Sequence, residues 1–342
     1  MSTFPTEKIG DKYVYEGPLG SGSAGLAELF KIKETGEIVA IKKVGINVAN
    51  RDSLFRELNF LKSSNHKNII KLFDAWKSDD DELFTVREAG KANLEEFLVK
   101  FPIKTLEEVA RISFQIISGV NYMHKRGLIH ADLKFGNIVI AGDYNEVKII
   151  DFDRSVPVEK AKNNAVVIHG TVGYEAPELI MGEHFDCKAD CWTVGVIIAE
   201  MIIADDYLFV PVDGQSFIDL YHFTLGTPSE SYLEKINHDF KDTYFKNKTY
   251  EGFKWEDILG KKDVIKNSTE EEKESYYDLL NSLIKFDPDE RLSMEKALKH
   301  KFLSKFQGFE DYFSEISCYD PTVEKEVNND WRKAFDDALD KF

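Results

Sequence analysis

Short runs of apolar residues separated by polar turns characterise the first third of the chain and predict β-strands. The expected strands are Tyr13–Leu19, Ala27–Lys33, Ile38–Val44, a segment near Ile69–Trp76 and Leu83–Val86. Leu54, Leu58 and Leu61 recur at helical spacing and predict a helix over Arg51–Leu61. The first third is therefore expected to be rich in strands.

After about Ala89 the apolar residues recur with a helical period. Thr105 and Glu108 form a capping box that opens one of the expected helices. Its apolar face consists of Val109, Ile112, Ile116, Val120 and Met123. We expect an α+β protein with a small strand-rich part followed by a larger helical part, and a ligand cleft near Glu88–Lys91, where the pattern changes.

Composition and charge narrow the class of protein. Of the 342 residues, 43% are hydrophobic and 31% are charged, which is ordinary for a soluble globular protein. No apolar run reaches the roughly 18 residues of a membrane helix, and the N-terminus does not resemble a secretory signal. Cys187, Cys191 and Cys318 form neither a disulfide framework nor a zinc pattern. We therefore expect a cytoplasmic or nuclear protein with no membrane association.

The net charge of −17 argues against a nucleic-acid partner, because phosphates would be repelled. An acidic surface suits basic protein or peptide partners, although a solvated acidic surface is the more common meaning.

A glycine-rich turn, Gly20–Gly25, has the pattern G-x-G-x-x-G, in which the backbone can approach phosphate groups closely. The same pattern can open a dinucleotide-binding unit, but a strand rather than a helix is expected after Gly25. Lys42 ends the next strand, and Glu57 follows on the expected helix. These two are either solvated surface charges or a pair that holds the α- and β-phosphates of ATP, and the preceding turn favours the second interpretation.

The strongest candidate site combines His130–Asn137 with Asp151–Asp153. Asp132 is suited to orient an attacking hydroxyl and accept its proton, and Lys134 is suited to stabilise the negative charge of a phosphoryl group. Asn137 and Asp151 offer the hard oxygen ligands that Mg²⁺ prefers, and Mn²⁺ would accept the same ligands. Each residue alone is common in turns, but the ordered set predicts a phosphotransferase.

With these motifs, the chain resembles the eukaryotic protein kinase family over about Tyr13–Phe302. Three later segments add to the resemblance: Gly170–Thr171 leading into Ala176–Glu178, then Asp190–Gly195 and Phe286–Arg291. The resemblance implies a bilobal fold with an N-terminal extension at 1–12, an N-lobe at 13–88, a C-lobe at 89–303 and a helical tail at 304–342. It implies transfer of the γ-phosphoryl group of Mg-ATP to serine or threonine hydroxyls of protein substrates.

The resemblance also assigns roles to individual residues. The residues implied for ATP binding are Leu19, Gly20, Gly22, Gly25, Ala27, Ala40, Lys42, Glu57, Glu88 and Gly90. Arg291 is expected to pair with Glu178, and Asp190 to brace the backbone near His130. Thr171 beside Lys134 is typical of the serine/threonine-directed members.

Several departures from the family pattern leave two alternatives open. Where the family has H-R-D, this chain has His130–Asp132 with Ala131 in place of the arginine. Where the family has D-F-G, it has Asp151–Asp153 with Asp153 in place of the glycine. Both changes also resemble small-molecule kinases, which lack the later segments, and Asp153 favours a pseudokinase or scaffold. A side chain at a glycine position that needs positive φ costs about 1–2 kcal/mol. Since the phosphate and metal residues are all present, an active protein kinase is preferred.

Other departures concern regulation and specificity. In the family, the arginine of H-R-D often binds a phosphate on the activation loop. Ala131 cannot bind such a phosphate, and Val167, at the position that often carries it, cannot be phosphorylated. Activity independent of activation-loop phosphorylation is therefore expected. Glu175 favours a basic residue near the phosphorylated position. Arg87 aligns with the position before the hinge that is called the gatekeeper, where an arginine is unusual; a one-residue bulge would move it away.

The last segment carries an apolar residue at every fourth position, which predicts an amphipathic helix beginning near Asp320–Pro321. The stripe consists of Val323, Val327, Trp331, Phe335 and Leu339. This tail is expected either to pack on the kinase, the commoner arrangement, or to bind a partner.

Overall fold

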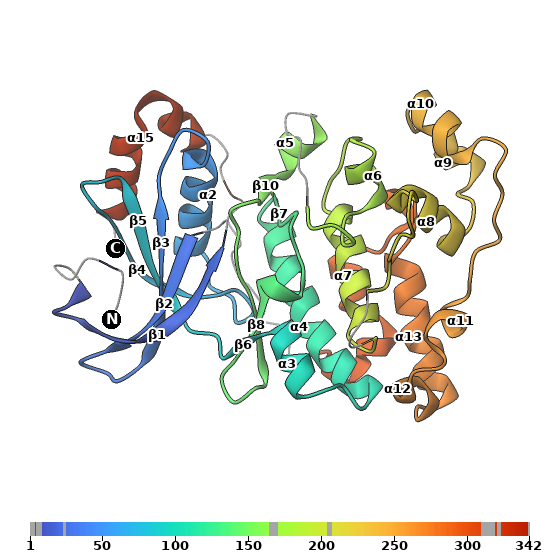
Figure 1. The fold of residues 1–342 in the computed structure, drawn as a ribbon, viewed down its shortest axis with the longest axis horizontal. Helices are drawn as coiled ribbons and strands as arrows, with labels where there is room; N and C mark the ends of the chain where they lie inside the picture. Colours follow the sequence, from blue (N-terminus) through green and yellow to red (C-terminus); the bar gives the residue numbers. More distant parts are fainter. Residues whose placement is uncertain are drawn as a thin grey trace. The chain divides into compact units, whose positions relative to one another are not determined.

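Contacts divide the chain into two units, which are described separately. Unit 1 comprises Met1–Ala92, Val139–Ser155 and Tyr319–Phe342, and unit 2 comprises Asn93–Ile138 and Val156–Cys318. The computed structural model describes residues 4, 9–22, 25–163, 170–203, 207–308, 319 and 323–340. Figure 1 labels the elements.

In the described part of unit 1, five strands form an antiparallel sheet in the order β1-β2-β3-β5-β4. The strands are β1 (Tyr13–Gly22), β2 (Gly25–Ile32), β3 (Ile38–Gly45), β4 (Leu72–Lys77) and β5 (Glu82–Glu88). The short strands β8 (Ile138–Ala141) and β9 (Glu146–Ile149) pair with each other, and β6 (Ala92–Asn93) precedes them in sequence. The expected strands are confirmed, although the fourth begins at Leu72 rather than near Ile69.

Helix α2 (Arg51–Lys62) confirms the helix expected from leucine spacing, and Leu54, Leu58 and Leu61 are buried. On one face of the sheet, Phe4 and Ile9 pack with Phe30 and Phe84, so residues preceding the first strand complete this part of the core. The apolar positions that alternate along β3 and β5 thus define the buried surface of the sheet.

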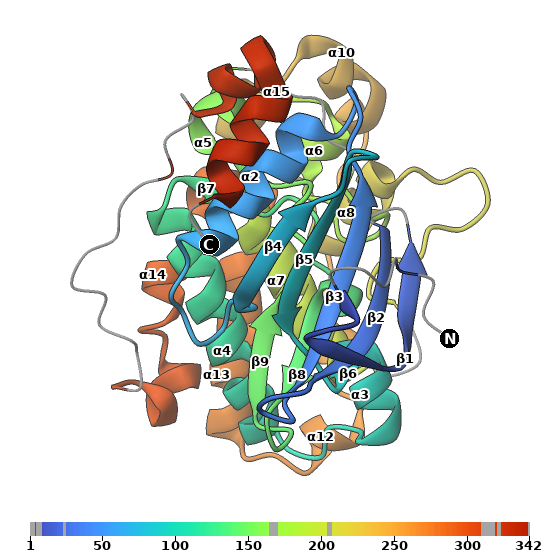
Figure 2. The ribbon, with the colours of Figure 1, turned by 90° about the vertical axis from the view of Figure 1, so that its left-hand side faces the viewer.

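The C-terminal helix α15 (Val323–Leu339) packs on α2 and β4 within the same unit (Figure 2). Val327 and Phe335 are fully buried in a cluster with Phe55 and Leu58, and the rings of Phe55 and Phe335 lie 5.2 Å apart. The helix contains a break at Asp330, which has φ −151° and ψ 88°. The start expected at Asp320–Pro321 lies outside the described residues.

Unit 2 is largely helical. Its elements are α3 (Leu94–Lys100), α4 (Leu106–Lys125), β7 (Leu128–Ile129), η1 (Phe135–Asn137), β10 (Val156–Pro157), α5 (Val158–Lys162), α6 (Pro177–Ile180), α7 (Lys188–Glu200), α8 (Phe217–Leu225), α9 (Glu230–Leu233), α10 (His238–Phe240), η2 (Lys241–Phe245), α11 (Trp255–Leu259), α12 (Asp263–Lys266), α13 (Glu270–Leu283), η3 (Pro288–Glu290), α14 (Met294–Ala297) and η4 (Lys301–Phe306). The capping box of Thr105 and Glu108 opens α4, as predicted.

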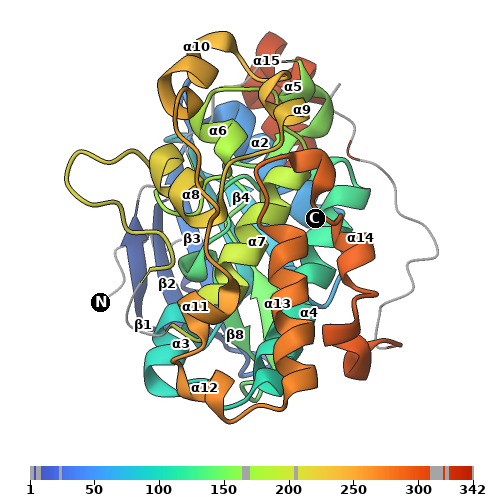
Figure 3. The same cartoon turned by 90° about the vertical axis from the view of Figure 1, so that its right-hand side faces the viewer.

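Helix α7 lies at the centre of unit 2, against α4 and α13 (Figure 3). It is apolar around most of its circumference and is buried from Ala189 to Glu200, which is the pattern of a helix enclosed by others. Gly195 allows the close approach of α13, because a Cβ atom there would lie 2.7 Å from Ile284. Over the residues that the structure describes, none of the helices has both the length and the apolar character to span a bilayer.

Candidate active site

Three polar side chains of unit 2 converge on Asp132, whose exposed fraction is 5%. The hydroxyl of Thr171 donates to Oδ1 of Asp132 at 2.7 Å, and Nζ of Lys134 lies 3.3 Å from Oδ2. Lys134 also donates to the Thr171 hydroxyl at 3.1 Å, which closes a triangle. Asn137 donates from Nδ2 to the Asp132 carbonyl at 2.8 Å. The structure therefore brings together the predicted Asp132, Lys134, Asn137 and Thr171, and it orients the Asp132 carboxylate from two sides.

Asp190 of α7 fixes the backbone just before Asp132. Its carboxylate accepts the backbone N–H groups of His130 at 2.8 Å and Ala131 at 3.0 Å, and it contacts Nε2 of His124 at 2.8 Å. Burial alone would raise the pKa of Asp190, but the hydrogen bond from His124 and the charges of His124 and His130 outweigh it and lower the pKa. The brace expected from the resemblance is thus present, and it holds Ala131 at a φ of 62°.

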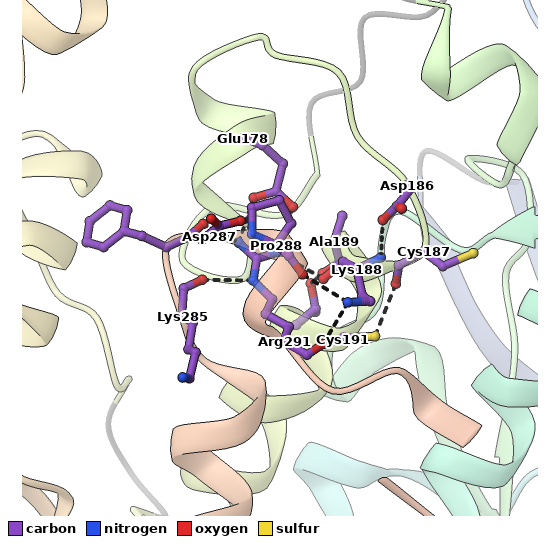
Figure 4. A network of polar contacts seen from close by, with 12 residues as sticks. Glu178, Asp186, Cys187, Lys188, Ala189, Cys191, Lys285, Asp287, Pro288 and Arg291 are labelled. Atoms are coloured by element: carbon purple, nitrogen blue, oxygen red, sulfur yellow. Dashed lines mark hydrogen bonds and ion pairs between the residues drawn. The ribbon is translucent and has the colours of Figure 1, made fainter. Parts of the chain in front are cut away.

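Arg291 and Glu178 form the ion pair expected from the resemblance (Figure 4). The two guanidinium nitrogens donate to the two carboxylate oxygens at 2.6 and 2.7 Å, a bidentate arrangement. The Arg291 side chain is fully buried and also donates to the carbonyls of Lys285, Phe286 and Lys188. This network fixes the segment after Thr171 to the end of unit 2.

In unit 1, Lys42 lies closer to Asp151 than to its expected partner. Its Nζ is 2.8 Å from Oδ1 of Asp151 and 3.8 Å from Oε2 of Glu57. The backbone N–H of Phe152 donates to Oε1 of Glu57 at 3.4 Å, a long hydrogen bond. The predicted Lys42, Glu57 and Asp151 therefore lie together, but the Lys42–Glu57 ion pair is the weaker of the two contacts.

Arg87, which the sequence marks as unusual, also belongs to this cluster, and that contact was not predicted. Its Nη1 donates to Oε1 of Glu57 at 2.9 Å, and its Nε donates to the hydroxyl of Thr85 at 3.0 Å. The ladder between β3 and β5 pairs Ala40 with Arg87 with no shift in register, whereas the β4–β5 ladder is irregular beside it, between the pairs Leu72–Arg87 and Asp74–Val86. An irregularity is therefore present at this position, but it does not move Arg87 away from the cluster. The sequence does show a charged residue directly after the mostly apolar strand segment Leu83–Val86, which suggests that Arg87 needs a partner. That partner, Glu57, lies 30 positions away in sequence.

The charges around Glu57 shift its pKa and that of Asp153 in opposite directions. Burial would raise the pKa of Glu57, but the positive charges of Arg87 and then Lys42 bring it down to about 2. Burial, together with the negative charges of Asp151 and Glu57, raises the pKa of Asp153 to about 6.

Backbone strain was expected at Asp153, in the usual glycine position, and that expectation is wrong. Asp153 is not among the described residues with positive φ, whereas Asp151 has a φ of 65° and Ala131 one of 62°. A carboxylate at position 153 therefore changes the charge of the cluster without the backbone cost that was predicted.

The remaining residues implied for ATP binding lie along the sheet of unit 1. Gly25 has a φ of +114°, and a Cβ there would lie 2.4 Å from the carbonyl of Lys43, so only glycine fits. Gly90 is similarly restricted, because a Cβ would lie 2.7 Å from Val139. The others are Leu19, Gly20 and Gly22 on β1, Ala27 on β2, Ala40 on β3 and Glu88 on β5. Ser23 and Ala24, in the glycine turn, lie outside the described residues.

The side chains predicted to bind a divalent cation are Asp151 and Asn137. Among the described residues, no group of three or more His, Cys, Asp or Glu side chains is placed to hold a metal ion. Asp151, in unit 1, offers a carboxylate, and Asn137, in unit 2, offers an amide oxygen. Both are oxygen donors of the kind that Mg²⁺ accepts, so the chemistry of each side chain fits this ion.

A cavity of about 440 Å³ in unit 2 lies beside Lys134 and Thr171, the two residues that contact the Asp132 carboxylate. Lys134 and Thr171 line this cavity, and so do the acidic residues Glu95 and Glu200. Glu95 is exposed on α3, whereas Glu200 is buried at the end of α7 and accepts the backbone N–H of Leu208 at 2.9 Å. The carboxylates of Glu95 and Glu200 thus line the same cavity as Lys134 and Thr171.

Comparisons with known proteins agree with these motifs. The family model described as protein kinase domain matches residues 13–303. The stress-activated protein kinase JNK of Suberites domuncula is 30% identical over 361 residues, which cover 99% of this chain and 93% of that protein. The mitogen-activated protein kinase p38a of Drosophila melanogaster is 28% identical over 349 residues, which cover 94% and 91%, respectively.

Proposed function

Because the chain belongs to the protein kinase family and is a protein serine/threonine kinase, we propose that Asp132 orients the substrate hydroxyl and accepts its proton. The triangle of Asp132, Lys134 and Thr171 carries this proposal. Thr171 and Lys134 each bond a different carboxylate oxygen of Asp132, so the side chain cannot rotate away from an incoming hydroxyl. No other carboxylate of unit 2 has this combination of partners among the described residues.

The other residues are assigned to ATP and its metal. Members of the family use ATP and a divalent metal ion, and Mg-ATP would supply the phosphoryl group. We propose that Asp151 and Asn137 provide oxygen ligands to Mg²⁺, or to Mn²⁺, and that Lys42 contacts the nucleotide phosphates. Lys134 would stabilise the negative charge of the phosphoryl group during transfer. The backbone of Glu88 and Gly90 would bond adenine, and the glycine turn from Gly20 to Gly25 would approach the phosphates.

The first test is transfer of labelled γ-phosphate from Mg-ATP to a generic basic protein, followed by phosphoamino-acid analysis. We expect the label on serine and threonine. ATP binding without any transfer would contradict the proposal and favour a scaffold. Label that appears only on a small amino sugar or choline would favour a small-molecule kinase instead.

We also propose that substrates carry a basic side chain near the phosphorylated residue. The support is the cavity next to Lys134 and Thr171, where Glu95 and Glu200 contribute negative charge. A guanidinium or ammonium group in this cavity would gain from both carboxylates. Glu175, which follows Tyr174 near the same loop, adds to the negative field.

Glu95→Gln is expected to lower kcat/KM about three- to fivefold for a peptide with arginines around its serine, since a partly exposed ion pair is lost. A peptide with the arginines replaced by alanine should be phosphorylated equally by both enzymes. Glu107→Gln removes an exposed carboxylate of α4 that does not line the cavity, and it serves as the control. Equal effects of Glu95→Gln on the two peptides would contradict the basic preference.

For the tail, we propose a stabilising role within unit 1 rather than the capture of a separate partner. The support is the apolar stripe of α15, whose residues Val327 and Phe335 are buried against α2. Val167 lies outside the described residues, so independence from loop phosphorylation stays a prediction. The cytoplasmic or nuclear location and the domain boundaries also stay predictions.

A further inference from the structure

We propose that Arg87, rather than Lys42, is the side chain that positions Glu57. In unit 1, Arg87 then anchors helix α2, and Lys42 contacts the phosphates of ATP. In this arrangement Arg87 is a positioning residue that acts through Glu57 and does not touch the nucleotide. The role assigned to Lys42 rests on the proposed kinase function, whereas the anchoring by Arg87 does not.

The distances around Glu57 distinguish the two cations. Arg87 donates a hydrogen bond of 2.9 Å to Oε1 of Glu57, while Nζ of Lys42 stays 3.8 Å from Oε2. Lys42 instead makes its short contact, 2.8 Å, with Asp151. A 2.9 Å charge-assisted bond is well within hydrogen-bonding range, and 3.8 Å is not. Glu57 therefore has its direct bond with the guanidinium.

Burial makes this bond important. The side chains of Glu57 and Arg87 are 3% and 10% exposed, so neither charge is screened by water. A buried carboxylate without a bonded cation is strongly destabilising. Arginine is well suited to the task, because its guanidinium keeps its charge when buried and its planar fork bonds two groups at once. Here the second group is the hydroxyl of Thr85, which fixes the fork against β5.

The position of Arg87 makes it a rigid anchor. It lies on β5, an interior strand that pairs with β3 and β4; the β3–β5 ladder is regular at this point, and the β4–β5 ladder has an irregularity beside Arg87. Glu57 lies in the middle of α2, so the bond joins the helix to an interior strand of the sheet. Both partners of the bond belong to the protein, so the bond itself requires no nucleotide.

The anchor also reaches the segment that follows Asp151. Oε1 of Glu57, the atom that Arg87 bonds, also accepts the backbone N–H of Phe152.

The test compares Arg87→Met, Arg87→Lys and Lys42→Met, with Lys43→Met as a control. Lys43 neighbours Lys42 on β3 and forms an ion pair with Glu82 at 2.8 Å, but it has no contact with Glu57. Thermal unfolding is measured without nucleotide, and kcat and KM for ATP are measured with the peptide substrate. The Tm values require no kinase activity, so they report on the anchor alone.

We expect Arg87→Met to lower the Tm by about 10 °C, because Glu57 is left buried without its bonded cation. Its kcat should fall about tenfold or more as α2 shifts, with KM for ATP changed about twofold or less. Arg87→Lys should restore a large part of both. Lys42→Met should abolish transfer but leave the Tm within about 2 °C of the wild type, as should Lys43→Met.

The double variant Arg87→Met/Glu57→Gln separates the ion pair from simple packing. If the pair is the anchor, removing the Glu57 charge relieves the defect, and the Tm of the double variant exceeds that of Arg87→Met. The inference is overturned if Arg87→Met unfolds like Lys43→Met, or if Lys42→Met lowers the Tm as much as Arg87→Met does. A wild type that transfers no phosphate would contradict the proposed kinase function, while the Tm values would still decide this inference.

Discussion

Asp132→Asn is expected to slow phosphoryl transfer by about a thousandfold, because the amide cannot accept the proton of the substrate hydroxyl. The exchange preserves shape, and the amide oxygen can still accept the hydrogen bond that Thr171 now donates at 2.7 Å. The surrounding braces, Asp190 on the backbone of His130 and Ala131, are untouched. Initial rates with labelled ATP and a basic peptide would measure the loss.

Two further measurements distinguish a slower transfer step from weaker ATP binding or partial unfolding. Binding of a fluorescent ATP analogue and the Tm should both stay close to the wild-type values, since the exchange preserves the size of the side chain and Lys42, which is proposed to contact the ATP phosphates, belongs to unit 1. Asp143→Asn, which removes a fully exposed carboxylate near Lys91, should change neither rate nor stability. A rate for Asp132→Asn above about a tenth of the wild type would show that another group accepts the proton.

Much of the fold and of the site was predictable because the relevant signals are local. Strands and helices follow from apolar periodicity, and the start of α4 follows from Thr105 and Glu108, three positions apart. The catalytic residues Asp132, Lys134 and Asn137 lie within six consecutive positions, so their meeting requires only a short loop. The pairing of Arg291 with Glu178, 113 positions apart, came only from the family resemblance.

What could not be predicted depends on partners brought together by tertiary packing. Arg87 could be recognised as unusual, but nothing local to β5 indicates that Glu57 is its partner. The backbone conformation of Asp153 was misjudged for a related reason: a glycine in the usual motif need not mean positive φ at that position in this chain. Here the strained residues are Asp151 and Ala131, and the backbone N–H of Ala131 donates a hydrogen bond to the carboxylate of Asp190, which holds it in place.

The tail illustrates the same limit. Its apolar stripe predicted a helix, but a stripe does not identify the surface that it covers. In the structure α15 covers α2, the helix that carries Glu57, and it adds a charged contact that the periodicity could not suggest. Arg56, the neighbour of Glu57 in sequence, donates to both carboxylate oxygens of Glu324 at 2.7 and 3.2 Å. We therefore expect the tail to stabilise α2, the helix that carries Glu57.

Glu324→Gln is expected to lower the free energy of unfolding by about 3–5 kcal/mol, because it leaves the Arg56 charge buried without a carboxylate. Arg56 and Glu324 are only 9% and 2% exposed, so water cannot replace the lost partner. Arg56 would keep its hydrogen bond of 2.6 Å to the carbonyl of Ser155, and Tyr319 would lose its carboxylate acceptor. Urea denaturation followed by tryptophan fluorescence would measure the change.

The matched control lies on the same helix. Arg332 of α15 pairs with Asp81 at 2.6 Å, but its side chain is 61% exposed, so Arg332→Ala should leave the denaturation midpoint almost unchanged. Replacing both buried partners, in Arg56→Met/Glu324→Leu, should recover most of the stability lost in Glu324→Gln, since no uncompensated charge is left. If Glu324→Gln unfolds at the same urea concentration as Arg332→Ala, the buried pair does not hold the tail on α2, and the apolar stripe alone must account for its docking.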